Sequence, residues 1–335
     1  MTGARSTLEL DAVPALPGLY ARGVAGSIRA AASRRSAVST GSLPTHEVVV
    51  RGVRADPTRL TDYQHLVGEP ASDVVPAGFL HVLAFPVATA LMVRGDFPLP
   101  LLGMVHLSNR VEQRRAVHVE EVLDVRVRAR DLRAHRSGVA VDLVADLTVD
   151  GVVVWRGVST YLAKGLRLDG PETPFDVSDA DGGPARPARP AFEPPIPTGQ
   201  WRLDADVGRR YAAVSGDRNP IHLSSLAAKA LGFPRTIAHG MYTAARALAE
   251  VGPGARGDAY LWEAEFAKPV LLPSTVTVRI APADGGPGDG GGSGGGGTAG
   301  GGTAGGGRSG GLTFVGWDAR RGRLHLTGTV RPLTP

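Results

Sequence analysis

The chain has 335 residues, enough for two domains, and its 42% hydrophobic and 21% charged residues are ordinary for a soluble globular protein. The net charge is +5, but only three of the 37 basic residues are Lys, and the many Arg are balanced by 32 acidic residues. We therefore expect no nucleic-acid partner. The absence of Cys excludes disulfide scaffolds, Cys-ligated metal centres and cysteine nucleophiles.

Residues 1–45 form an N-terminal extension with no sustained apolar run, so we expect no secretory signal peptide and a cytoplasmic location. The first folded unit, residues 46–167, carries an apolar stretch of helical length at 78–93. Residues 74–93 are uncharged, yet two Pro, a Gly and a His interrupt them. A buried helix is therefore favoured over a membrane span.

Short segments of alternating polarity follow this helix. In the strand that ends at Arg130, charged residues alternate with Leu, Val and Ala, which is typical of a half-buried strand. The Asp150-Gly151 pair between two apolar runs predicts a tight hairpin. Strands are expected at residues 101–109, 117–130, 139–149 and 152–162.

Residues 168–198 are rich in Pro, Asp and Gly and are typical of a linker. The second unit, 199–335, has an expected helix at 240–251 and a flexible Gly-rich insertion at 285–311, which holds 18 of the 46 Gly residues. Four strands are expected around the insertion, at residues 260–266, 275–281, 312–317 and 324–330.

A helix followed by antiparallel strands thus occurs twice, and residues 105–129 weakly resemble 261–281. This order predicts an α+β fold in which each of two curved sheets wraps around one buried helix.

Residues 211–222, YAAVSGDRNPIH, are the most informative stretch. Turn-forming residues place a loop between two helical pieces, and a bend at Pro220 lets Asp217 and His222 converge. Asp and His together form an acid–base pair that works near neutral pH. Taken singly, each residue is better explained by a structural role, Asp217 as a helix N-cap and His222 as a structural histidine.

Residues 232–241, GFPRTIAHGM, precede the second predicted helix. A Gly at this point allows close approach of a ligand to the backbone, and free N–H groups at a helix N-terminus suit a developing oxyanion. An acid–base pair beside such a donor is suited to proton transfer next to a thioester carbonyl.

Together the two strings resemble the signature of MaoC-like (R)-specific enoyl-thioester hydratases and 3-hydroxyacyl-thioester dehydratases, of the hydratase-2 type. The close resemblance covers about residues 201–281. The resemblance implies a tandem, or double, hotdog in which each repeat wraps a curved antiparallel sheet around a central helix. Residues 46–167 would be a degenerate hotdog without catalytic groups, and residues 199–335 the catalytic one.

The resemblance also implies roles for single residues. Asp217 and His222 would hold and activate the catalytic water, and Asn219 would orient this pair. Ser215 and Gly216 would shape the turn. The backbone N–H of Gly240 would bind the thioester oxygen, and no metal or redox cofactor is expected.

The extension and the insertion depart from the family pattern, and we expect neither to touch the motif. A structural role is favoured for His239, and core positions for His81, Phe79 and Phe85, although the two Phe could also line an acyl tunnel. The basic side chains of one strand and turn could meet coenzyme A phosphates or an acidic carrier protein, but a solvated face is favoured; they are Arg126, Arg128, Arg130, Arg133 and Arg136.

The expected substrate is an acyl-CoA or acyl-carrier-protein (ACP) thioester, and the oligomeric state is left open, a homodimer included. Three alternatives remain: a non-catalytic acyl-thioester-binding protein of the same fold, a hotdog thioesterase, and a scaffold that recruits partners through its linker and Gly-rich segment.

Overall fold

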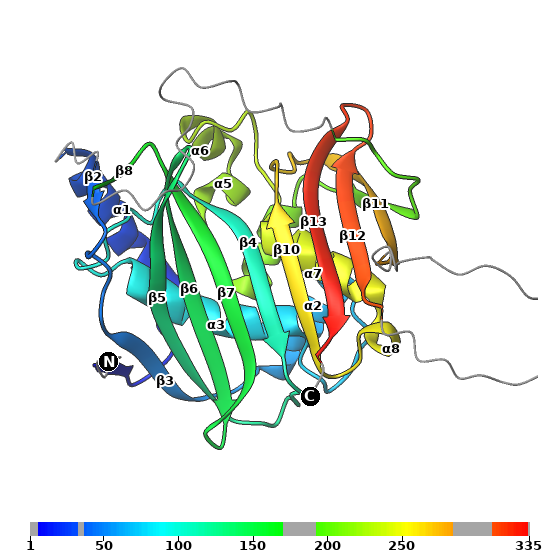
Figure 1. The fold of residues 1–335 in the computed structure, drawn as a ribbon, viewed down its shortest axis with the longest axis horizontal. Helices are drawn as coiled ribbons and strands as arrows, with labels where there is room; N and C mark the ends of the chain where they lie inside the picture. The colour runs from blue at the N-terminus through cyan, green and yellow to red at the C-terminus, as the bar shows by residue number, and fades with distance from the viewer. Residues whose placement is uncertain (1–5, 33–36, 170–191, 284–309, 334–335) are drawn as a thin grey trace, which may run out of the picture.

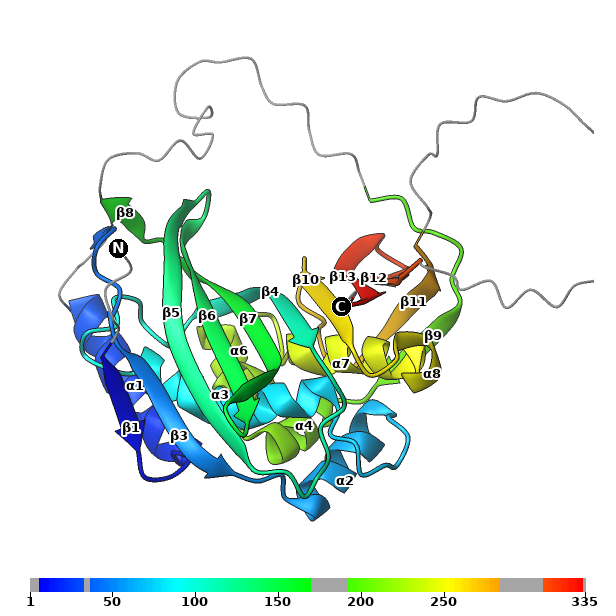
Figure 2. The same ribbon diagram turned by 60° about the horizontal axis from the view of Figure 1, so that its bottom comes forward.

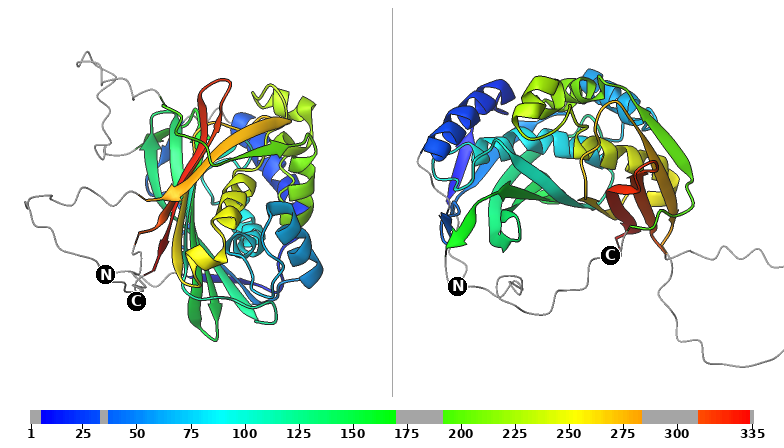
Figure 3. Two further views of the ribbon diagram at one scale, coloured as in Figure 1. Left: turned by 90° about the vertical axis from the view of Figure 1, so that its right-hand side faces the viewer. Right: turned by 90° about the horizontal axis from the view of Figure 1, so that it is seen from above.

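The computed structural model describes residues 6–32, 37–169, 192–283 and 310–333. Their main feature is one curved eleven-stranded sheet with helices on its concave side (Figures 1 and 2). The side view in Figure 3 separates the sheet from the helical layer. The strand order is β1-β3-β5-β6-β7-β4-β10-β13-β12-β11-β9, and a second, two-stranded sheet joins β2 to β8.

The first half of the sheet wraps around α3 (Ala77–Met92), which is buried along nearly its whole length. This helix begins directly after Pro76, because a proline lacks the N–H that a preceding helical turn would need and disfavours helical geometry in the residue before it. The strands of this half are β1 (Thr7–Leu10), β3 (Glu47–Val53), β5 (Leu123–His135), β6 (Gly138–Val149), β7 (Val152–Lys164) and β4 (Met104–Gln113).

Two sequence patterns in this half, the alternation in β5 and the Asp-Gly pair, form the structures they predict. Val125, Val127 and Ala129 of β5 are buried, and the Arg residues between them lie on the other face. The β6–β7 hairpin turns at Asp150 and Gly151, which both have positive φ, at 49° and 79°. That geometry is the one expected for an Asp-Gly hairpin.

The second half is built in the same way around α7 (Gly240–Val251), whose bounds match the predicted helix. Its strands are β10 (Tyr260–Phe266), β13 (Arg323–Pro332), β12 (Leu312–Asp318), β11 (Ser274–Pro282) and β9 (Gly199–Leu203). The predicted insertion connects the antiparallel neighbours β11 and β12, but residues 285–309 of it lie outside the described residues, as do residues 170–191 of the predicted linker.

The halves meet where β4 pairs antiparallel with β10, from Tyr260 opposite Gln113 to Glu265 opposite Ser108. Each of these strands directly follows the central helical region of its own half, so the two repeats are related across the seam. The predicted α+β tandem hotdog is confirmed.

The remaining helices lie near the two central ones. They are α1 (Leu16–Ala32), α2 (Pro57–Val67), α4 (Val207–Ser215), α5 (Pro220–Leu223), α6 (Ser225–Ala230) and α8 (Pro253–Arg256), and the short strands are β2 (Ala37–Ser39) and β8 (Arg167–Asp169). No helix within the described ranges is long and apolar enough to cross a membrane.

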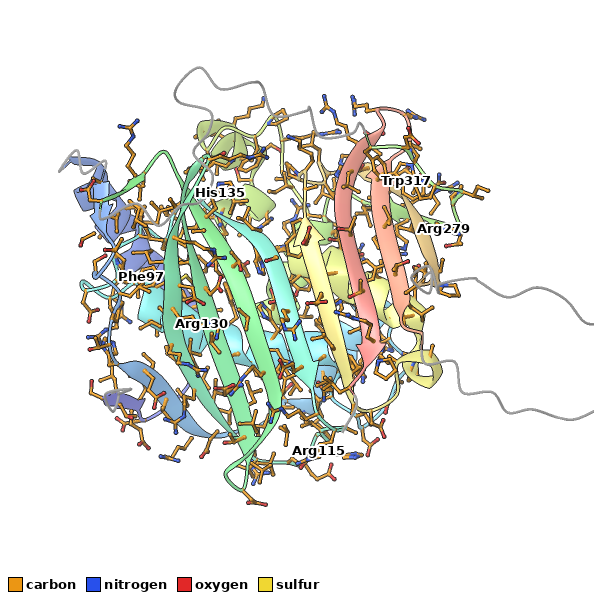
Figure 4. All side chains as sticks on the ribbon, viewed as in Figure 1. Phe97, Arg115, Arg130, His135, Arg279 and Trp317 are labelled. Atoms are coloured by element: carbon orange, nitrogen blue, oxygen red, sulfur yellow. The ribbon has the colours of Figure 1, made fainter. Side chains whose placement is uncertain are left out.

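The Arg residues of β5 are engaged in ion pairs along the sheet. Arg128 pairs with Asp146 at 2.6 Å and Arg133 with Asp142 at 2.9 Å, while Arg126 pairs with Glu47 on β3. Figure 4 shows Arg130 on this strand, and Arg130 contacts Asp131 at 3.0 Å. This arrangement supports the predicted solvated face, because the cations are already neutralised.

Candidate active site

The site is built on the turn between α4 and α5. Gly216 ends α4 in the left-handed conformation, with φ of 77°, and Asn219 caps the N-terminus of α5 by accepting from the Ile221 N–H at 3.4 Å. Pro220 starts the new helix in a position where its missing N–H costs nothing. The reversal of direction at this turn brings Asp217 and His222 together, as predicted.

The carboxylate of Asp217 receives several hydrogen bonds. Its Oδ1 accepts from the backbone N–H of Asn219 at 3.1 Å and from the hydroxyl of Tyr20. Its own N–H donates to Ser215 Oγ at 3.1 Å. Ser215 therefore shapes the turn as expected, whereas Asn219 acts through its backbone N–H and its side chain is occupied as a cap.

His222 is held as one defined tautomer. Its Nδ1 lies 2.8 Å from the carbonyl oxygen of Ile237, and because a carbonyl can only accept, Nδ1 carries the proton. Nε2 is left as an acceptor. A Cβ at Gly208 would lie 2.3 Å from the carbonyl oxygen of His222, so Gly208 allows α4 to pack this closely against α5.

His239 lies in the same cluster, although a structural role is favoured from sequence. Its ring stacks on that of His222 with 3.6 Å between centroids. Its Nε2 donates to the backbone oxygen of Asp217 at 3.0 Å and lies 3.7 Å from Asp217 Oδ2. His239 is thus the link between the turn and α7.

Gly240 is the first residue of α7, so its N–H has no acceptor within the helix. The Phe266 ring lies 3.0 Å from where a Cβ of residue 240 would be. A larger side chain would press against this ring, which gives a packing reason for Gly in addition to the backbone access predicted from sequence.

The electrostatics favour an ionised carboxylate beside neutral imidazoles. Burial alone would raise the pKa of Asp217, but His239, His222 and the hydroxyl of Tyr20 together hold it below its usual value. Burial lowers the pKa of His222, and the charge of Asp217 only partly offsets this. Burial, followed by the neighbouring His222, lowers the pKa of His239 to about 3.

Side chains from the N-terminal half also face this cluster. Burial lowers the pKa of His81 to about 4 and that of His106 to about 3, and in both cases the charge of Asp217 opposes the shift. Burial and then Asp217 raise the pKa of Tyr161. The ring of His106 stacks on Tyr161 at 4.6 Å and lies 5.1 Å from Phe266.

No sequence motif marks Tyr20, His106 or Tyr161. The last two lie in predicted strands, where an aromatic or polar side chain is unremarkable. His81 is buried as expected, but beside the site rather than remote from it. The expectation that the N-terminal extension does not touch the motif is wrong, because Tyr20 of α1 binds Asp217 directly.

A small hollow of about 20 Å³, room for roughly one water molecule, adjoins these residues, between α3 and strands β6 and β7. It is lined by His81, Ala84, Phe85, Ala88, Leu143, Ala145, Trp155, Gly157, Ser159 and Tyr161. Phe85 therefore borders a space, while Phe79 is fully buried and packs edge-on against Tyr63.

Asp217, His222 and His239 bring one potential metal ligand each within 4.8 Å of one another. His222 Nδ1 and His239 Nε2 both donate to backbone carbonyls and carry protons there. Nε2 of His222 and Nδ1 of His239 are thus the unprotonated ring nitrogens of the cluster, and such a nitrogen can act as a base.

Comparison with known proteins yields a consistent picture. Residues 187–293 match the model of the MaoC like domain. The chain is 37% identical over 265 residues to 3-hydroxyacyl-thioester dehydratase X of Mycobacterium tuberculosis, covering 79% of this chain and 90% of that protein. It is also 36% identical over 77 residues to 3-hydroxybutyryl-CoA dehydratase of Methylorubrum extorquens, about half of that protein's length.

Among solved structures, the crystal structure of HtdX of Mycobacterium tuberculosis superposes with a TM-score of 0.67 at 33% identity. The match covers 86% of this chain and all of that one. A MaoC-like dehydratase from Phytophthora capsici superposes with a TM-score of 0.61 at 19% identity, which supports the fold alone.

Proposed function

The chain belongs to the family of MaoC-like dehydratases, and from this premise we propose that it interconverts trans-2-enoyl thioesters and (3R)-3-hydroxyacyl thioesters. The observation that carries the proposal is the turn that holds the Asp217 carboxylate near the unprotonated Nε2 of His222. A hydro-lyase needs such a pair, because one proton must leave and return within a single turnover.

In hydration, Asp217 and His222 hold a water molecule between them. The water oxygen bonds to C3 as one of the two groups accepts its proton, and the electrons of the C2–C3 double bond move toward the thioester carbonyl. That proton then reaches C2 on the same face, so both side chains return to their starting states. Dehydration follows the same path backwards: the C2 proton is removed and the C3 hydroxyl leaves as water.

The enolate-like charge that forms at the thioester oxygen is stabilised by the N–H of Gly240 at the N-terminus of α7. By analogy with other oxyanion holes, one such donor contributes roughly 3 kcal/mol to the transition state. Ser215, Gly216 and Asn219 keep the turn in its shape through the contacts described above.

We propose CoA as the carrier, with ACP as the alternative, and we assign the catalytic unit to residues 199–335. Residues 46–167 supply the other half of the sheet, and the acyl chain enters beside α3, where the small hollow has to widen to take it. The cytoplasmic location and a homodimer stay predictions, which cell fractionation and sedimentation velocity test.

The first experiment follows the absorbance of the enoyl-thioester band with crotonyl-CoA and with a longer trans-2-enoyl-CoA. Wild type should remove the band without releasing thiol. Asp217→Asn should be slower by about 100- to 10,000-fold, the usual contribution of a general acid–base group. Asp204→Asn, at an exposed position, is the matched control and should retain full activity.

Release of free thiol would indicate a thioesterase instead. Equal band loss in wild type and Asp217→Asn would remove Asp217 from the mechanism. If the wild type has no activity on either CoA substrate or on an acyl-carrier-protein thioester, a non-catalytic binding protein would be favoured.

A further inference from the structure

The N-terminal helix α1 lies directly on the catalytic turn. Leu16 is buried, and its Cδ1 lies 2.6 Å from where a Cβ of Gly216 would be, so the helix fits only over a Gly at that point. Leu19 is 1% exposed. A Cβ at Gly23 would lie 2.5 Å from Cδ2 of Leu101, so the helix also needs Gly at this position. Since positions 16, 19, 20 and 23 share one face of a helix, this packing fixes where Tyr20 points.

Tyr20 donates a hydrogen bond from its hydroxyl to Oδ1 of Asp217. The same oxygen accepts the backbone N–H of Asn219, so Oδ1 has two donors, and Oδ2 is the oxygen that faces His239. A carboxylate fixed at one oxygen cannot rotate freely, and its second oxygen is held toward the imidazoles.

We propose that Tyr20 is a positioning residue of the active site, which holds the carboxylate of Asp217 in the orientation that presents Oδ2 to the reacting water. The inference rests on the proposed hydratase activity and extends it to the N-terminal segment. Tyr20 acts through Asp217 and not on the acyl thioester, so its loss lowers the rate of the chemical step more than it alters substrate affinity.

The groups around Asp217 come from both halves of the chain. Tyr20 on α1, His222 on α5 and His239 at the start of α7 are adjacent to the carboxylate, and its charge also reaches His81 on α3, His106 on β4, Tyr161 on β7 and Tyr211 on α4. Of these, only the Tyr20 hydroxyl donates a side-chain hydrogen bond to the carboxylate within the described part of the chain.

The test compares wild type with Tyr20→Phe, which keeps the ring and removes the hydroxyl. Loss of a hydrogen bond to a charged group predicts a fall in kcat of about 10- to 100-fold with little change in KM. The acidic limb of the rate profile should also move to higher pH, because a carboxylate that loses a donor has a higher pKa.

Two control variants distinguish the effect of the Tyr20 hydroxyl on Asp217 from the effect of packing α1 against the turn. Tyr63→Phe removes a buried hydroxyl that has no hydrogen-bond partner among the described residues, and it should keep kcat within about twofold. Leu16→Ala keeps the Tyr20 hydroxyl but loosens α1, and it should reduce kcat less than Tyr20→Phe does. Thermal unfolding of each variant reports whether the fold is retained.

Unchanged kcat and pH profile in Tyr20→Phe would overturn the inference, and so would a faster variant, which would show that α1 obstructs the site. A readout without substrate covers the case in which wild type is inactive: the ¹³C-carboxyl titration of Asp217, assigned with Asp217→Asn. Its midpoint should rise in Tyr20→Phe. An unchanged midpoint contradicts the role of Tyr20, whereas an inactive wild type with a shifted midpoint contradicts only the proposed hydratase activity.

Discussion

At the residue scale, the candidate site combines a carboxylate with two imidazoles that each carry one proton. The carbonyl of Ile237 fixes the His222 proton on Nδ1, and the backbone oxygen of Asp217 fixes the His239 proton on Nε2. Both imidazoles are buried, which disfavours their charged forms, while the neighbouring His239 and His222 and the hydrogen bonds to Oδ1 hold the pKa of Asp217 below its usual value. The site is therefore poised as carboxylate and neutral base near pH 7.

These shifts predict the pH dependence of kcat/KM. The active form is the deprotonated form of every group, so it accumulates as pH rises and is lost as pH falls. Because the pKa values of Asp217, His222 and His239 all lie below their ordinary values, activity should be flat from about pH 7 upward and decline only below about pH 6.5. The profile with crotonyl-CoA measures this. An alkaline limb near pH 7 would instead require a protonated histidine.

At the scale of elements, α3 and α7 hold equivalent places in the two repeats but have different surroundings. The N-terminus of α7 meets the turn around Asp217 through His239. α3 instead contributes Ala84, Phe85 and Ala88 to the hollow against β6 and β7. One helix thus serves chemistry, and the other borders the space proposed for the acyl chain.

Filling this hollow should change chain-length preference. Ala88→Phe places a large ring where the hollow has to widen for the acyl chain, so kcat/KM for a ten-carbon enoyl-CoA should fall at least about tenfold, since each buried methylene is worth about 0.8 kcal/mol. The value for crotonyl-CoA should stay within about threefold. Ala88→Ser, which leaves the space open, is the control. An equal loss on both substrates would place the acyl chain elsewhere.

At the scale of the whole molecule, the two halves are joined by more than the β4–β10 seam. Arg256, at the end of α8, forms two hydrogen bonds of 2.9 and 3.0 Å to the carboxylate of Glu69, which follows α2. Both side chains are almost fully buried, at 8% and 4% exposure, and Arg256 also donates to the carbonyl of Leu248 on α7. This ion pair ties the C-terminal helices to the N-terminal half.

Breaking the pair should destabilise the fold. Glu69→Gln leaves the guanidinium of Arg256 buried without a counter-charge and should lower the free energy of unfolding by about 3 kcal/mol. Glu9→Gln removes the exposed partner of Arg51 and should cost less than about 1 kcal/mol. Urea unfolding of both variants measures the difference. Equal urea midpoints of the two variants would mean that the buried pair stabilises the fold no more than the exposed pair does.

Local sequence patterns predict the two helix-and-sheet repeats and the turn around Asp217. Apolar runs of helical length located α3 and α7, Asp150-Gly151 located a hairpin, and the turn formers around Asp217 located a loop that the structure retains. These features are local, since each depends on residues within about a dozen positions of one another. The strand bounds were less accurate: β4 begins three residues later than expected, at Met104, and runs on to Gln113, because its length is set by pairing with β7 and β10.

The surroundings of Asp217 depend on contacts between residues that are far apart in the chain. Tyr20 lies 197 positions away in a helix that carries no motif, and His106 and Tyr161 are ordinary members of their strands. The Glu69–Arg256 pair spans 187 positions. No local pattern marks such residues, because their proximity results from the packing of one repeat against the other and of α1 against the turn.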